Sequence, residues 1–189
     1  MNKTDLRKKF KLLRASLSVS DIEDLSIAIA NNLLKTPVWK GTYYHLFLSI
    51  AEKREIDTSY ILSILQGKDK EIVVSKTHIE DNSLTHYLLT ENTRLVKSKW
   101  GIPEPVDGIE VPLEKLDVVF VPLLAFDKNG QRIGYGKGFY DTFLSKCRPD
   151  VIKIGLSFFE AEPDIDNIYE TDVPLDYCIT PTTIYTFTK

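Results

Sequence analysis

The sequence contains only two cysteines, Cys147 and Cys178, in 189 residues. This is too few for the disulfide framework of a small secreted domain, and the two have no metal-ligand spacing. Both lie among apolar residues, so we expect buried free thiols. The three histidines show no metal-ligand spacing either. We interpret His45 as structural, and His78 and His86 as surface or strand residues.

The chain also lacks an apolar run long enough to span a membrane and lacks an excess of positive charge. Its formal net charge is −3, which argues against a general nucleic-acid-binding surface. The N-terminal segment is basic but amphipathic, without the apolar core of a signal peptide. No repeat, low-complexity tract or linker is visible. We therefore expect one cytoplasmic domain over 1–189, a monomer without membrane or nucleic-acid partners.

Strand-like and helix-like segments alternate along the chain, which favours an α/β fold. The predicted strands are Thr42–Ile50, Glu71–Lys76, Ser83–Leu89, a run from Val118 to Leu124, Asp150–Phe158 and Leu175–Thr180. The predicted helices are Asn2–Leu17, a helix of about fifteen residues opened by the capping-box pattern at Ser20–Glu23 and closed by Pro37, Ser59–Leu65, and one from Phe139 onward. We predict a mostly parallel central sheet with helices on both faces, a three-layer, Rossmann-like arrangement.

The first two helices have apolar stripes that predict their buried faces. The stripes are Leu6, Phe10, Leu13 and Leu17 in the first helix, and Ile22, Leu25, Ile29 and Leu33 in the second. The remaining positive charges of the first helix, Lys8, Lys9, Lys11 and Arg14, are interpreted as a solvated face. Lys3 and Arg7 are four residues apart and therefore share one face near the helix start.

The stretch from Val118 to Leu144 organises the chain. An unbroken apolar run, Val118–Val121, predicts a strand buried on both faces. A glycine cluster at 134–138 and a helix follow, an order typical of loops that hold phosphates. Arg132 and Lys137 add two cations. The spacing matches neither a Walker A loop nor a dinucleotide fingerprint, so spacing alone leaves phosphate binding and an ordinary glycine turn equally open.

The identities in this stretch are more specific than its spacing. The run AFDKNGQRIGYGKGFYD at 125–141, preceded by Val121-Pro122, resembles the signature of the 5-formyltetrahydrofolate cyclo-ligases, also called methenyltetrahydrofolate synthetases. Weaker matches follow in the family's order and span nearly the whole chain. They are the pair Lys3 and Arg7, the motif Glu55–Thr58, the segment Trp100–Pro105, and Asp172.

The resemblance implies ATP-dependent cyclisation of 5-formyltetrahydrofolate to 5,10-methenyltetrahydrofolate, with release of ADP and phosphate, and with ATP and Mg²⁺ as cofactors. It implies catalytic roles for Arg132 and Lys137, and Mg²⁺ ligation by Asp141 and Asp172. The implied ATP-binding residues are Lys3, Arg7, Arg132, Gly134, Tyr135, Gly136, Lys137, Gly138, Phe139 and Tyr140. The implied folate-binding residues are Leu48, Ile50, Glu55, Trp100 and Tyr140. The family fills position 135 variably, so Tyr135 has no individual role here.

The residues considered without the resemblance leave plainer interpretations open. The pair Lys3 and Arg7 suits a solvated basic face, Glu55 suits a surface carboxylate before a helix, and Trp100 suits a core anchor. Asp141 suits the first turn of a helix. Two other functions also stay open: an ATP-using kinase of a small metabolite, and a non-catalytic module that binds folate or nucleotide. The 132–141 segment contains Arg132, Lys137 and Asp141 together. This complete set favours an enzyme over a binding module, which could lose them.

Overall fold

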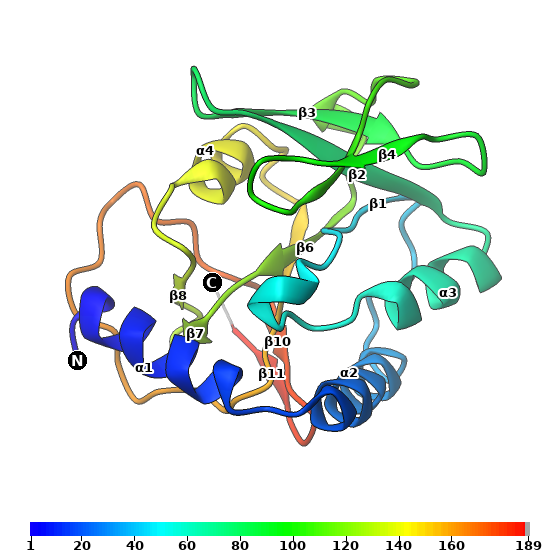
Figure 1. Cartoon of the computed structure of the whole chain (residues 1–189). Coiled ribbons are helices and arrows are strands. Elements are labelled where there is room, and N and C mark those ends of the chain that lie inside the picture. Colours follow the sequence, from blue (N-terminus) through cyan, green and yellow to red (C-terminus); the bar gives the residue numbers. More distant parts are fainter. Residues whose placement is uncertain (188–189) are drawn as a thin grey trace.

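The computed structural model describes residues 1–187 and is built around a seven-stranded sheet in the order β11-β10-β9-β6-β1-β2-β3 (Figure 1). These strands are β1 (Tyr43–His45), β2 (Glu71–His78), β3 (Ser83–Leu88), β6 (Val118–Pro122), β9 (Ile152–Leu156), β10 (Tyr177–Ile179) and β11 (Ile184–Thr186). The five strands from β10 to β2 are mutually parallel, whereas β3 and β11 pair antiparallel at the two edges. The predicted, mostly parallel α/β sheet is confirmed.

Strand β6 shows why the protein has three layers. Val118 and Phe120 lie in the apolar cluster formed with α2 (Val19–Leu33) and α3 (Ser59–Gly67). Val119 and Val121 lie in the cluster on the opposite face, with α4 (Phe139–Ser145). Successive side chains of a strand point to opposite faces, so this unbroken apolar run fills two cores at once. The predicted burial of the strand on both faces is confirmed.

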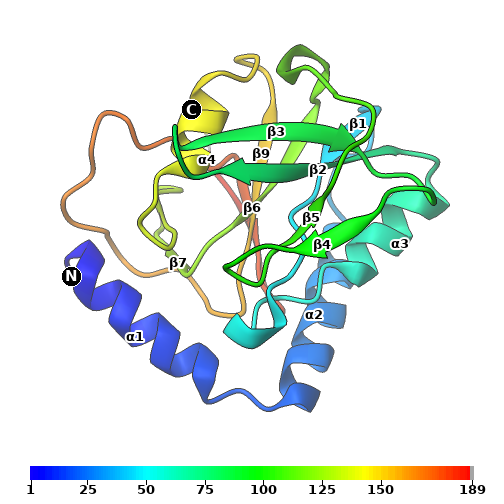
Figure 2. The same cartoon turned by 45° about the horizontal axis from the view of Figure 1, so that its top comes forward.

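Helix α1 (Lys3–Ala15) lies beside a small hairpin of β7 (Ala125–Phe126) and β8 (Arg132–Ile133), away from the main layers (Figures 1 and 2). Leu6 and Phe10 fill this contact. The predicted stripe was wrong at Leu13, which is 39% exposed, and Arg14 was wrongly placed on the solvated face. The buried face runs 6, 10, 14 at four-residue spacing, and Arg14 is tolerated there because its guanidinium finds polar partners inside.

Several element boundaries differ from the prediction. Helix α2 begins at Val19, because Ser18 and Asp21 form the reciprocal capping box; Ser20 is not the cap. Strand β1 is only Tyr43–His45, because the chain leaves the sheet after Leu46 and turns through the short 3-10 helix at Ala51–Lys53. The edge strand β11 was not predicted. A second short hairpin, β4 (Leu95–Lys97) with β5 (Pro103–Pro105), lies beside β2 and carries the turn at 98–102 (Figure 2).

Both cysteines are free, with Cys178 fully buried and Cys147 partly buried. Within residues 1–187 no helix has the length and apolar character needed to cross a membrane. The helix assignments at 59 and 139 are confirmed, with α3 extending to Gly67 and α4 ending at Ser145.

A polar chain interrupts the core beneath α4. His45 Nε2 lies 2.6 Å from Ser75 Oγ, which lies 2.8 Å from His86 Nδ1. His45 is fully buried and His86 is 5% exposed, and Phe143 packs on both imidazole rings. Burial lowers the pKa of His86 from 6.5 to about 4 and lowers that of His45 well below 6.5. Both rings are therefore neutral at pH 7.

The histidine pKa values predict acid sensitivity. Well above pH 6.5, the rings of His45 and His86 are neutral in both the folded and the unfolded chain. As the pH falls from 6.5 towards about 4, the unfolded chain binds a proton at His86 that the folded chain excludes, so the free energy of unfolding decreases by roughly 2–3 kcal/mol from this residue. Urea titrations between pH 7.5 and pH 4 should show a shallower decline for His86→Gln than for the wild type. Parallel declines would contradict the assignment.

A second prediction concerns close packing around β9. A Cβ at Gly155 would lie 2.6 Å from Leu175 Cδ1 and 2.7 Å from Leu123 Cδ2. Gly155→Ala should therefore lower the free energy of unfolding by about 1–3 kcal/mol. Gly67→Ala, at the end of α3 with nothing within 4 Å, is the matched control and should be neutral or stabilising by up to about 1 kcal/mol. Urea denaturation of both variants tests this, and equal effects would refute the packing argument.

Candidate active site

A cleft of about 300 Å³ opens at the carboxyl ends of β1, β2 and β6. Ligand sites in parallel α/β sheets usually lie at this edge. The structure brings every residue predicted for the site to this one cleft, namely Lys3, Arg7, Leu48, Ile50, Glu55, Trp100, Arg132, Gly134, Tyr135, Gly136, Lys137, Gly138, Phe139, Tyr140, Asp141 and Asp172. Their proximity is a structural fact, while their individual roles stay predictions.

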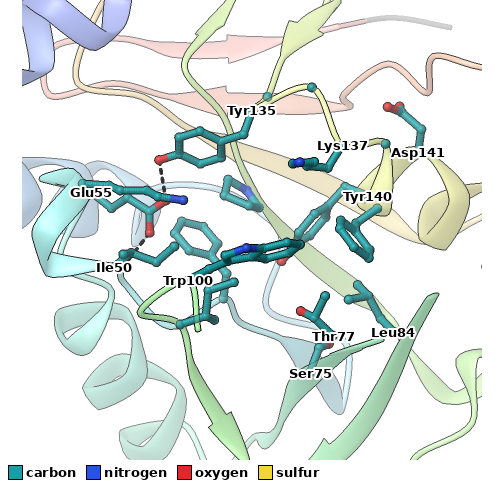
Figure 3. A pocket seen from close by; sticks show the side chains of 18 of the residues that line it. Ile50, Glu55, Ser75, Thr77, Leu84, Trp100, Tyr135, Lys137, Tyr140 and Asp141 are labelled. Atoms are coloured by element: carbon teal, nitrogen blue, oxygen red, sulfur yellow. Dashed lines mark hydrogen bonds between the residues drawn. The ribbon is translucent and has the colours of Figure 1, made fainter. Parts of the chain in front are cut away.

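The glycine loop at 134–138 joins β8 to α4 along one wall (Figure 3). Gly136 and Gly138 have φ angles of +92° and +74°, which residues with a side chain rarely adopt. A Cβ at Gly136 would also lie 3.4 Å from the Arg7 guanidinium. Arg7 Nε donates to the Gly134 carbonyl oxygen at 3.1 Å. The start of α1 is therefore fixed to the loop, so Arg7 does not lie on a freely solvated face.

The cations of the cleft differ in their partners. Lys3 Nζ pairs with the Asp172 carboxylate. Arg132, whose side chain is 5% exposed, donates to Asp141 Oδ1 at 2.9 Å and to the Val173 carbonyl at 2.7 Å. Lys137 has no carboxylate partner within residues 1–187. Its ammonium lies 5.5 Å from the centre of the Trp100 ring.

Each of the two carboxylates predicted to bind metal has one oxygen already bonded. Asp141 Oδ1 accepts from Arg132 and from Val173 N, and Asp172 Oδ2 accepts from Lys3 and from Tyr169 N. The other oxygen of each carboxylate has no hydrogen bond from the described part of the chain. No group of three or more His, Cys, Asp or Glu side chains able to hold a metal occurs in residues 1–187. A cation here would need ligands from a bound molecule or water.

Glu55 is buried at the opposite end of the cleft, at 7% exposure. Its Oε2 accepts from Ile50 N at 2.7 Å, and its Oε1 accepts from the Tyr135 hydroxyl at 2.7 Å (Figure 3). The alternative of a surface carboxylate is therefore wrong. Trp100 lies in the β4–β5 turn, half-buried, with its ring 6.1 Å from that of Phe139. It forms part of the cleft wall and is not a member of the three apolar clusters of the described residues.

Sequence reasoning missed one wall and one buried cation. Ser75, Thr77 and Leu84 of β2 and β3 line the cleft below Trp100 (Figure 3). No motif marks them, because only the pairing of these strands brings them to the site. Arg14 is 6% exposed and donates to the Tyr135 hydroxyl at 2.8 Å and to Leu123 O at 2.7 Å. Its position one helical turn beyond Phe10, on the buried face of α1, was the sequence feature that could have indicated its burial.

One residue of the 125–141 run is structural. Asp127 is fully buried, and its carboxylate accepts N–H bonds from Asn129, Gln131 and Ile165. It shapes the turn between β7 and β8 and does not line the cleft. Tyr140 does line it, and its burial and the negative charge of Glu55 raise the pKa of its phenol. It therefore stays protonated at neutral pH.

Comparison with known proteins identifies the family. Residues 1–181 match the family model described as the 5-formyltetrahydrofolate cyclo-ligase family. A probable 5-formyltetrahydrofolate cyclo-ligase of Schizosaccharomyces pombe is 27% identical, with 96% of each chain aligned. The 5-formyltetrahydrofolate cyclo-ligase of Escherichia coli K12 is 30% identical over 69% of this chain and 74% of its own.

A solved structure agrees with these sequence matches. The 5,10-methenyltetrahydrofolate synthetase of Aquifex aeolicus superposes with a TM-score of 0.82 at 31% identity, covering 100% of this chain and 94% of that one. The match of the family model over nearly the whole chain, with the same fold in a structural relative, places this chain in the 5-formyltetrahydrofolate cyclo-ligase family, a family of ligases.

Proposed function

We propose that this protein catalyses the ATP-dependent cyclisation of 5-formyltetrahydrofolate to 5,10-methenyltetrahydrofolate, releasing ADP and phosphate. Family membership supports the reaction class. The observation that carries the proposal for this chain is that one cleft joins a glycine loop with four nearby cations to a wall with a buried carboxylate and an indole ring. A nucleotide and a folate would therefore meet at the same edge of the sheet. The cytoplasmic location and the monomeric state stay predictions.

The chemistry explains the need for ATP. The oxygen of an N5-formyl group is a poor leaving group. Transfer of the γ-phosphoryl group to that oxygen gives an iminium phosphate, N10 attacks the formyl carbon to close the ring, and phosphate leaves with the oxygen. The activated species must be kept from water, which requires a cleft that closes around both substrates.

The loop and its cations would hold and neutralise the phosphates. Phosphoryl transfer depends mainly on positioning and on charge stabilisation. The backbone N–H groups of the loop, together with Lys3, Arg7 and Lys137, supply both. Lys137 is the best placed for the transferring group, because it lies free of carboxylates beside Trp100. Arg132 contributes positive charge to the cleft while it orients Asp141.

Two carboxylates fit a magnesium ion that arrives with a nucleotide. Mg²⁺ typically takes one or two protein carboxylates and fills its other positions with phosphate oxygens and water. Asp141 and Asp172 both line the cleft, and each has one oxygen without a hydrogen bond from the described residues. These two residues would hold the ion, which would supply charge neutralisation at the phosphates. Arg132 and Lys3 would keep the carboxylates oriented.

The opposite wall would bind the folate. The carboxylate of Glu55 can accept N–H bonds from a pterin ring, since a carboxylate is an acceptor with lone pairs to spare. Leu48 and Ile50 give this end an apolar lining. Trp100 offers an aromatic face to the pterin or the aminobenzoyl ring.

The first prediction of this function is ATP-dependent formation of the methenyl chromophore. Purified protein mixed with 5-formyltetrahydrofolate, ATP and Mg²⁺ should produce it, and a sample without ATP should not. Asp141→Asn keeps an acceptor for Arg132 and Val173 N but removes the charge needed by the metal, so its rate should fall by about 10²-fold or more. Wild-type protein that binds ATP without forming product would refute the proposal.

The second prediction separates a folate enzyme from a kinase of another metabolite. Glu55→Gln and Trp100→Ala should each weaken 5-formyltetrahydrofolate binding by about tenfold or more. Both should leave the affinity for ATP unchanged, as measured by calorimetry. Glu52→Gln is the matched control, because Glu52 is an exposed carboxylate paired with Lys97 outside the cleft lining. Folate binding unaffected by both variants would favour the kinase.

A further inference from the structure

A buried hydrogen-bond chain connects helix α1 to the predicted folate carboxylate. Arg14 Nη1 donates to the Tyr135 hydroxyl at 2.8 Å, and that hydroxyl donates to Glu55 Oε1 at 2.7 Å. Arg14 and Glu55 are 6% and 7% exposed. The phenol thus lies between a buried cation and a buried carboxylate, which do not form a direct ion pair.

The direction of this chain is fixed by the donors available. A guanidinium can only donate, so the phenol oxygen accepts from Arg14 and its single hydrogen points at Glu55. Burial and the charge of Glu55 raise the pKa of Tyr135, so the hydrogen is retained. With Ile50 N on the other oxygen at 2.7 Å, both carboxylate oxygens are held from defined directions. Their remaining lone pairs are left for a ligand.

Tyr135 also belongs to the glycine loop. Its chain neighbours are Gly134, whose carbonyl accepts from Arg7, and Gly136, which has φ +92° and is exposed. Phosphates that fix this loop would fix the backbone that carries the phenol. Tyr135 therefore links the predicted phosphate end of the cleft to the predicted folate end.

We propose that Tyr135, supported by Arg14, is a positioning residue that orients Glu55 and couples nucleotide binding to folate binding. The inference rests on the proposed function. A nucleotide that orders the loop lowers the entropic cost of holding Glu55 in its binding geometry, so nucleotide and folate strengthen each other's binding. Thermodynamic linkage requires the two effects to be equal in size.

The test is calorimetric titration of 5-formyltetrahydrofolate with and without a saturating non-hydrolysable ATP analogue and Mg²⁺. In the wild type the analogue should increase folate affinity about fivefold or more. Tyr135→Phe keeps the ring over which Lys53 Nζ lies, at 4.5 Å, but lacks the hydroxyl. Its folate affinity with the analogue present should be about tenfold lower, and the coupling factor should fall to about one. The KM for folate should rise more than kcat falls.

Tyr185→Phe is the matched control. Its hydroxyl donates to Glu160 Oε2 at 2.7 Å, the same group and distance, away from the cleft lining. It should keep wild-type affinity and coupling. Arg14→Lys, which keeps the charge but loses the fork that reaches both Tyr135 and Leu123 O, should reduce the coupling without changing ATP affinity. Thermal unfolding of each variant separates misfolding from loss of coupling.

The outcomes distinguish this inference from the function on which it rests. Active wild-type enzyme without coupling, or Tyr135→Phe with unchanged affinity and coupling, would overturn the role of Tyr135 and leave the cyclisation intact. Wild-type protein without ATP-dependent product would overturn the proposed function itself. If Tyr135→Phe unfolds, the coupling measured for Arg14→Lys decides the matter, and wild-type coupling in that variant overturns the inference.

Discussion

Burial of β6 on both faces is the constraint on which the rest of the structure depends. An unbroken run of β-branched and aromatic side chains can be kept from water only in the middle of a sheet that is covered on both sides. Strand β6 accordingly lies between β1 and β9, with α2 and α3 against one face and α4 against the other. Its carboxyl end opens at mid-sheet, so the segment that follows it reaches the cleft directly.

Contacts beside this strand hold later segments of the chain together. Gly155 of β9 leaves room for Leu123 and Leu175 to close over the sheet. Arg132 then ties the 173 region to α4 through its bonds to Val173 O and Asp141. Segments separated by 41 and 32 residues are thereby held at one wall of the cleft. The geometry of the site is therefore a consequence of how the core is closed.

Local patterns allowed the fold class to be predicted, whereas the residues of the site were predicted from the resemblance of several motifs to the cyclo-ligase signature. The strand–loop–helix order around Gly136 and the motif at Glu55 are contiguous in the chain. What could not be predicted depends on pairing across the fold. The bond between Tyr135 and Glu55, and the chain from His45 to His86 through Ser75, each join residues from different elements. Arg14 was misassigned because its four-residue spacing from Phe10 indicates the buried face, but only its partners Tyr135 and Leu123 explain how a cation is accommodated there.

The pairing of charges in the cleft bears on how a nucleotide would bind. Lys3 and Arg132 are each engaged by a carboxylate, Asp172 and Asp141. A phosphate that recruits either cation leaves a partly buried carboxylate without its partner, which is costly. On the proposed function, a divalent cation that binds with the phosphates would compensate both carboxylates at once, because each has an oxygen to spare. The lining also carries Arg7, Lys53 and Lys137, which have no carboxylate partner in the described part of the chain, so the empty cleft keeps an excess of positive charge. On the proposed function this excess would attract the nucleotide, while the spare carboxylate oxygens would receive the cation that comes with it.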